Sequence, residues 1–135
     1  MKPELDAPCT QNPTAGSKTT YSRTFTREDV ASFAEISGDK GIHHMLPDPK
    51  GRIMVQGLLT ATLPTKLGGD LNYIARRITF EFLRPVFVGD TVTCEGTVLN
   101  VAESEDRLEV SMSFRCTNQA GKEVLRGGTE GIIRR

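Results

Sequence analysis

An aspartate and a histidine stand five residues apart at the point where a short amphipathic segment meets a turn. Asp39 follows Ser37-Gly38, and His44 is preceded by a second histidine, His43. A carboxylate and an imidazole that converge on one water molecule can serve as a general base and a general acid. An isolated Asp-x4-His pair also suits a solvated turn, because a motif is only a hypothesis until its context agrees. The elements around the pair therefore decide between the two interpretations.

A helix is predicted directly before the pair. Residues 19–25 alternate in the manner of a strand, and Thr26 with Asp29 three positions later resembles a capping box, which marks a helix start. Apolar side chains at every third or fourth position give the next segment one apolar face. Gly38 suits the helix end because glycine tolerates the left-handed cap conformation. Asp39 is thus expected just beyond a rigid element, in a loop that exposes it.

A second helix is predicted over residues 57–69, after a proline-containing loop at 41–51. Its side chains are apolar on nearly every face, so the helix has to be buried on most sides. Pro64 removes one backbone hydrogen bond and crowds the preceding turn, so it is expected to kink the helix or to shorten its regular part.

Strands are predicted for the second half of the chain. Alternation of apolar and polar residues predicts strands over 74–82, 91–101, 108–117 and 123–133. Consecutive strands with short turns form an antiparallel sheet whose apolar face needs a cover. The predicted fold class is therefore α+β, with a curved antiparallel sheet wrapped around one long central helix. Residues 19–135 are expected to form one domain, and residues 1–18, which lack an apolar period, an irregular N-terminal arm.

Composition excludes several classes of function. The 135 residues carry 17 basic and 17 acidic side chains, so there is no electrostatic footprint for nucleic acid or an anionic membrane. No apolar run approaches the length of a membrane span, and the N-terminus lacks the apolar core of a signal peptide. Cys9, Cys94 and Cys116 lack metal-site spacing. They predict free or buried thiols in a reducing cytoplasm and no metal centre.

Three blocks of sequence give the chain a family resemblance. The first runs from Phe25 (FTREDV) through Ser37-Gly38-Asp39 to His44, the second is GRIMVQGLLTA at 51–61, and the third is FLRPVFVGDTV at 82–92. In this order and at these separations they resemble the MaoC-like dehydratases, the family of (R)-specific enoyl-CoA hydratases. The resemblance implies the hotdog fold and the reversible hydration of a trans-2-enoyl thioester to a 3-hydroxyacyl thioester. It also implies a homodimer or higher homo-oligomer, and no cofactor beyond the CoA or acyl carrier protein that carries the substrate.

The resemblance also assigns candidate site residues. Asp39 and His44 are expected to act on one water, and the backbone N–H of Gly57 is expected to donate a hydrogen bond to the enolate oxygen. Thr65, at the family's small hydroxyl position on the same helix, could hydrogen-bond Asp39. Gln56 replaces the family's histidine, and its amide either donates to the thioester or pairs with nearby backbone.

Two further side chains are secondary candidates. His43 is a second candidate acid, with an exposed or loop-stabilising role as the alternative, and Arg84 is a candidate for binding the phosphates of CoA. The family's Gly-Asp-x-Asn-Pro-x-His motif is altered, because Gly41 and Ile42 stand at its Asn and Pro positions.

These departures keep two other functions open. One is a hotdog acyl-CoA thioesterase, and the other is a non-catalytic acyl-CoA-binding hotdog protein. Some thioesterases of this fold place a carboxylate on the central helix, and residues 57–67 contain none. Others use an aspartate in the loop before that helix, a position that Asp39 could fill.

Overall fold

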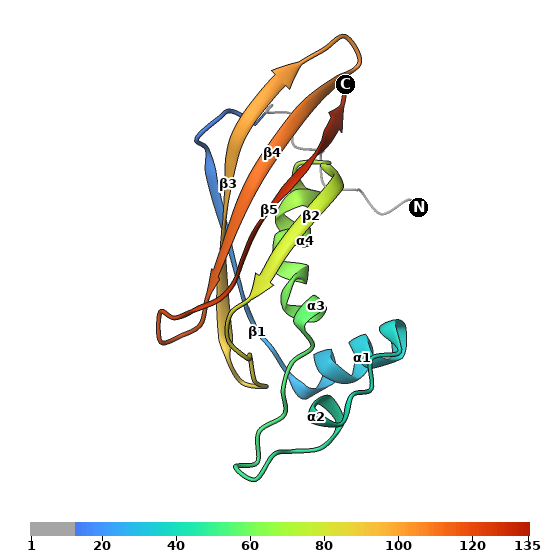
Figure 1. The fold of residues 1–135 in the computed structure, drawn as a ribbon, viewed down its shortest axis with the longest axis vertical. Helices are drawn as coiled ribbons and strands as arrows, with labels where there is room; N and C mark the ends of the chain where they lie inside the picture. Colours follow the sequence, from blue (N-terminus) through green and yellow to red (C-terminus); the bar gives the residue numbers. More distant parts are fainter. Residues whose placement is uncertain (1–12) are drawn as a thin grey trace, which may run out of the picture.

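The computed structural model describes residues 13–135, so Cys9 and most of the N-terminal arm lie outside the described residues. Five strands form one antiparallel sheet in the order β1-β3-β4-β5-β2. Their bounds are Lys18–Thr24 (β1), Ile74–Phe82 (β2), Thr91–Glu103 (β3), Arg107–Thr117 (β4) and Glu123–Arg134 (β5). Figure 1 shows the sheet curving along the central helical segments, which lie on its concave side. The predicted α+β architecture is therefore confirmed.

The central helix is interrupted. It consists of α3 (Gly57–Thr60) and α4 (Thr62–Asp70), separated at Ala61, and not of one continuous helix as the sequence suggested. Pro64 has no N–H to donate to the carbonyl of Thr60, four residues earlier, and its ring crowds that carbonyl. The interruption lies one residue after Thr60. The effect of Pro64 on that carbonyl therefore explains the interruption, as predicted from the sequence.

The core fills the space between the sheet and α4. Alternate residues of β3 and β4 point inward and are buried, and Leu63 and Leu67 of α4 pack against them. Cys94 and Cys116 face each other across β3 and β4, and both are free and fully buried, as predicted for these two thiols. The adjacent Cys116 side chain and burial both raise the pKa of the Cys94 thiol. A protonated, buried thiol is a poor nucleophile, so this pair is part of the core.

Two short helices lie beyond one end of the sheet (Figure 1). The first, α1 (Arg27–Ser37), begins with the predicted capping box: the Asp29 N–H donates to Thr26 Oγ1 at 3.1 Å, and the Thr26 N–H donates to the Asp29 carboxylate at 2.9 Å. Gly38 ends it with φ at 76°, as predicted. The second, α2 (Ile42–Met45), is a single turn within the segment predicted as loop. Its four residues are too few to show a helical period.

Strand β2 forms one edge of the sheet and is largely uncovered. A register shift between Ala75 and Arg77 bends it against β5. Ile74, Ile78 and Phe82 remain 41%, 56% and 50% exposed. Among residues 13–135, no helix combines the length and apolar character needed to cross a membrane.

Candidate active site

The end of α1 holds the backbone of Asp39. The Ser37 hydroxyl donates to the Phe33 carbonyl at 2.6 Å and accepts a hydrogen bond from the Asp39 N–H at 3.0 Å. The carboxylate Oδ1 accepts from the Gly41 N–H at 3.3 Å. Oδ2 is the oxygen that approaches His44.

His44 is buried on α2, and the backbone of a distant residue determines its tautomer. Its Nδ1 lies 2.7 Å from the carbonyl oxygen of Met54, which can only accept a hydrogen bond, so Nδ1 carries a proton. In a neutral ring Nε2 then has a free lone pair. That atom lies 3.4 Å from Asp39 Oδ2, with the His44 side chain 5% and the Asp39 side chain 49% exposed. The structure therefore brings the two predicted groups together, with solvent access from the Asp39 side.

Two backbone hydrogen bonds fix the end of the loop that carries Met54. The Met54 N–H donates to the His43 carbonyl at 3.0 Å, and the Val55 N–H donates to the Val86 carbonyl at 2.7 Å. The Asp48 carboxylate closes the loop by accepting from the backbone N–H groups of Lys50 and Arg52 and from Arg52 Nε. The hydrogen bond from the Arg52 backbone N–H is the main reason that the pKa of Asp48 lies below its usual value, and desolvation acts in the opposite direction.

Asp39 and His44 are called the dyad from here on. A cavity of about 320 Å³, here called the dyad cavity, opens beside His44, and Asp39 is not among the residues that line it. Its walls include His43, Met54, Gly57 and Phe82. Within the described chain, the N–H of Gly57 has no backbone or side-chain acceptor. A Cβ at this position would lie 3.0 Å from Cε1 of Phe82, so glycine lets the aromatic ring cover the helix start. The arrangement places an unpaired N–H donor and an imidazole on one cavity.

Gln56 is not available to a substrate. Its side chain is fully buried, and its Nε2 donates to the Val30 carbonyl of α1 at 3.0 Å. The expectation of a donor to the thioester is therefore wrong, and pairing with backbone is what the structure shows. Gln56 Oε1 has no partner among residues 13–135. A buried acceptor without a partner lowers the stability of the fold by about 1–3 kcal/mol. The hydrogen bond from Gln56 Nε2, which joins α1 to the start of α3, offsets this cost.

Of the other three candidates, Arg84 and His43 line the dyad cavity and Thr65 does not. Thr65 is exposed, its hydroxyl donates to the Ala61 carbonyl at 3.0 Å, and no hydrogen bond within residues 13–135 joins it to Asp39. Arg84 lines the dyad cavity, but its Nη1 donates to the Glu123 carbonyl at 2.7 Å. His43 lines the cavity, and its ring contacts that of His44 in a tilted arrangement, with ring centroids 3.9 Å apart.

Sequence patterns missed two parts of this site. Met54 contributes a backbone carbonyl, which no side-chain motif can reveal. The alternation over 74–82 predicts Phe82 on the apolar face of its strand, but its contact with Gly57 can be seen only in the folded structure. Among the described residues, no group of three or more His, Cys, Asp or Glu side chains is arranged to hold a metal ion.

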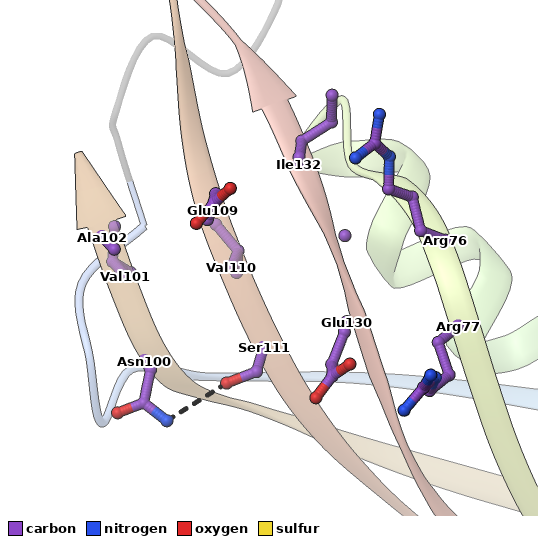
Figure 2. Close-up of a pocket in the computed structure, with 11 residues that line it drawn as sticks. Arg76, Arg77, Asn100, Val101, Ala102, Glu109, Val110, Ser111, Glu130 and Ile132 are labelled. Atoms are coloured by element: carbon purple, nitrogen blue, oxygen red, sulfur yellow. Dashed lines mark hydrogen bonds between the residues drawn. The ribbon is translucent and has the colours of Figure 1, made fainter. Parts of the chain in front are cut away.

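A larger concavity of about 660 Å³ lies away from the dyad. Figure 2 shows Arg76 and Arg77 of β2 on one side of it, Glu130 of β5 between the strands, and Asn100 donating to Ser111 at 3.2 Å. It contains charges of both signs but no imidazole or thiol. This face is the polar outer surface of the sheet.

An antiparallel sheet wrapped around a central helix, with an Asp–His pair at one end, is the architecture of a hotdog-fold protein. A family model described as the thioesterase superfamily matches residues 58–105. The (R)-specific enoyl-CoA hydratase of Aeromonas caviae is 31% identical over 130 residues, with 88% of this chain and 92% of the relative covered. The chain therefore belongs to the MaoC-like family of (R)-specific enoyl-CoA hydratases that its three sequence blocks resemble.

Two further similarities agree with this placement. The 3-hydroxybutyryl-CoA dehydratase of Methylorubrum extorquens is 28% identical over 145 residues, covering 99% of this chain and 88% of the relative. The unliganded structure of an R-hydratase from Pseudomonas aeruginosa superimposes with a TM-score of 0.77 at 28% identity, covering 90% of this chain and 82% of that one. The hotdog fold inferred from sequence is thereby confirmed.

Proposed function

We propose that this protein catalyses the reversible hydration of a trans-2-enoyl thioester, carried on CoA or acyl carrier protein, to the 3-hydroxyacyl thioester. The observation that carries the proposal is the 3.4 Å approach of His44 Nε2 to Asp39 Oδ2, beside a cavity that Gly57 also lines. The relatives named for enoyl-CoA hydration and 3-hydroxybutyryl-CoA dehydration support it.

The pair supplies the base and the acid that hydration needs. In its neutral form, His44 presents the Nε2 lone pair next to the Asp39 carboxylate, so one water can donate a hydrogen to each group and turn its own lone pair toward Cβ. As the O–Cβ bond forms, Asp39 takes a proton from the water. This proton then passes from the Asp39 carboxyl to Nε2 of His44, which lies 3.4 Å from Oδ2, and from Nε2 to Cα. All atoms of the water end on the substrate, so the reaction needs no oxidant and no resident cofactor.

Gly57 is the donor to the enolate oxygen in this proposal. Gly57 lines the dyad cavity, and its N–H has no acceptor among residues 13–135. Helix α3 has only four residues, so its dipole is small and the N–H itself has to stabilise the developing charge. Phe82 covers the Cα of Gly57 and restricts water at this point.

The direct test is hydration of crotonyl-CoA by the purified protein. We expect the absorbance of the conjugated enoyl thioester to fall without release of free thiol, and the product to be the (R)-3-hydroxy thioester. Release of thiol at the rate of absorbance loss would identify a thioesterase. Binding of crotonyl-CoA without either change would identify a non-catalytic acyl-CoA-binding protein.

The thioesterase alternative rests on the family model, which matches residues 58–105. That segment begins after Asp39 and His44, so the match reports the shared helix and strands and not the dyad. Residues 57–67 contain no carboxylate that could point at a thioester carbonyl. The hydratase is therefore the better-supported function.

We expect the protein to be at least a dimer, paired through β2. This edge strand leaves backbone groups and the apolar side chains of Ile74, Ile78 and Phe82 uncovered, and edges of this kind are commonly paired across a two-fold axis. Light scattering is expected to give about twice the chain mass of 14.8 kDa. Ile78→Glu should shift the protein toward monomer, because it places a charge in the paired edge.

Leu99→Glu is the matched control for this prediction. Leu99 is 48% exposed, close to the 56% of Ile78, but lies on β3, away from the β2 edge. The control should keep the oligomeric mass of the wild type. A fully active wild-type monomer at micromolar concentration would overturn the prediction.

A further inference from the structure

The dyad cavity shares a wall with a second cavity. The second one, here called the side cavity, has a volume of about 270 Å³. His43 and Met54 line both cavities. The other side-cavity residues are mainly apolar: Ile42, Leu46, Pro47 and Phe87, with Asp48 and Arg52. Arg52 already has partners here: its guanidinium lies 4.1 Å from the centre of the Phe87 ring, and its Nε donates to Asp48.

His43 is solvent-exposed, and packing contacts hold its imidazole in this wall. Its ring lies against the backbone of Gly41, where a Cβ would come within 2.9 Å of Cε1. The opposite contact is the ring of His44, at a centroid distance of 3.9 Å and an angle of 55°. No hydrogen bond or ion pair within residues 13–135 involves the His43 side chain. The glycine at position 41 therefore makes room for a ring whose shape, rather than its charge, closes the wall.

We propose that His43 is a specificity-determining residue: its ring closes the dyad cavity toward the side cavity and thereby limits branching of the acyl group. The inference rests on the hydratase function proposed above. A branch on the acyl chain, just beyond the reacting carbons, would meet this ring. With the ring removed, the branch would enter a space lined by Ile42, Leu46 and Phe87. One methylene group in a hydrophobic pocket changes specificity by about 10- to 200-fold, and because Ile42 and Leu46 are 71% and 58% exposed we expect a value near the lower end.

The test compares His43→Ala with His43→Phe on two substrates, linear crotonyl-CoA and the branched 4-methylpent-2-enoyl-CoA. For His43→Ala, kcat/KM on crotonyl-CoA should stay within about tenfold of wild type, while the branched-to-linear ratio rises at least about tenfold. His43→Phe keeps a ring of similar shape without titrating, so its ratio should match wild type. An unchanged ratio in His43→Ala, or the same rise in His43→Phe, would overturn the proposal.

A substitution that fills the side cavity tests whether the acyl branch enters it. Leu46→Trp in the His43→Ala background should return the ratio to the wild-type value, because Leu46 lines the side cavity. Ile36→Trp in the same background is the matched control. Ile36 is 88% exposed on α1 and lines neither cavity, so it should leave the raised ratio in place. Equal effects of the two tryptophans would contradict the assignment of the side cavity.

A binding measurement separates this inference from the proposed function. Calorimetry with butyryl-CoA and 4-methylpentanoyl-CoA, which are saturated and cannot be hydrated, gives the same branched-to-linear comparison as a ratio of Kd values. His43→Ala should raise relative affinity for the branched thioester at least about tenfold, and His43→Phe should not. A raised ratio without crotonyl-CoA hydration would overturn only the hydratase. Hydration with an unchanged ratio would overturn only the role of His43.

Discussion

Asp39→Asn and His44→Ala are each expected to lower kcat for crotonyl-CoA hydration by at least about 100-fold, the usual scale for a general acid–base group. Asparagine keeps the shape of the side chain but cannot take a proton from water. Alanine at position 44 removes the Nε2 that lies 3.4 Å from the carboxylate and the Nδ1 bound to the Met54 carbonyl. Steady-state kinetics with crotonyl-CoA measures both effects.

The double variant tests whether the two groups act together. Because both would act on the same water, Asp39→Asn with His44→Ala should lose little more than the worse single variant. Glu35→Gln is the matched control, since Glu35 is an exposed carboxylate on α1 whose one ion pair within residues 13–135 is with Lys40. It should leave kcat close to wild type. Either single dyad variant with near-normal turnover would remove the pair from the mechanism.

Gly127→Ala is expected to lower the free energy of unfolding by about 3 kcal/mol or more, at the upper end for overpacking. Gly127 of β5 is paired with Phe80 of β2. A Cβ there would lie 2.0 Å from the Thr79 carbonyl oxygen and 2.5 Å from Cδ1 of Phe80. The first obstacle is backbone, which cannot move aside as a flexible side chain can. The methyl group therefore has to push β2 away from β5.

Gly128→Ala is the control for this prediction, because the nearest atom to its Cβ is the Met112 carbonyl oxygen at 3.3 Å. Its free energy of unfolding should change by about 1 kcal/mol or less, because the better strand preference of alanine opposes the cost of a contact that is only slightly too close. Urea unfolding at constant m-value measures both changes. Similar midpoints for the two variants would mean that β2 does not need the close approach at Gly127.

Local chemistry in the sequence determined several elements directly. Thr26 and Asp29 specify the start of α1, because each side chain bonds to backbone only three residues away. Gly38 specifies its end through its own φ angle. Pro64 accounts for the broken central helix because proline acts on the carbonyl four residues earlier. Interactions this short depend on few other atoms, so a pattern in the chain is enough to predict them.

The candidate site needed more than these local rules. The Asp39 and His44 spacing and the family resemblance indicated the pair, but the His44 tautomer depends on Met54, ten residues away. Likewise, Gln56 turns from the substrate because Val30, 26 residues away, accepts its amide hydrogen.

The exposure of β2 was equally beyond the reach of sequence patterns. Its alternation of apolar residues predicted one apolar face, but alternation cannot tell whether a partner covers that face. Ile78 and Phe82 remain half exposed because β2 is the last strand of the sheet, a position that the order β1-β3-β4-β5-β2 assigns. Side-chain types and short spacings thus determined which groups this protein has for chemistry. Which atoms face one another was decided by the fold, which brings together backbone segments that are far apart in the sequence. A hydrogen bond forms within about 3 Å whatever the separation in sequence.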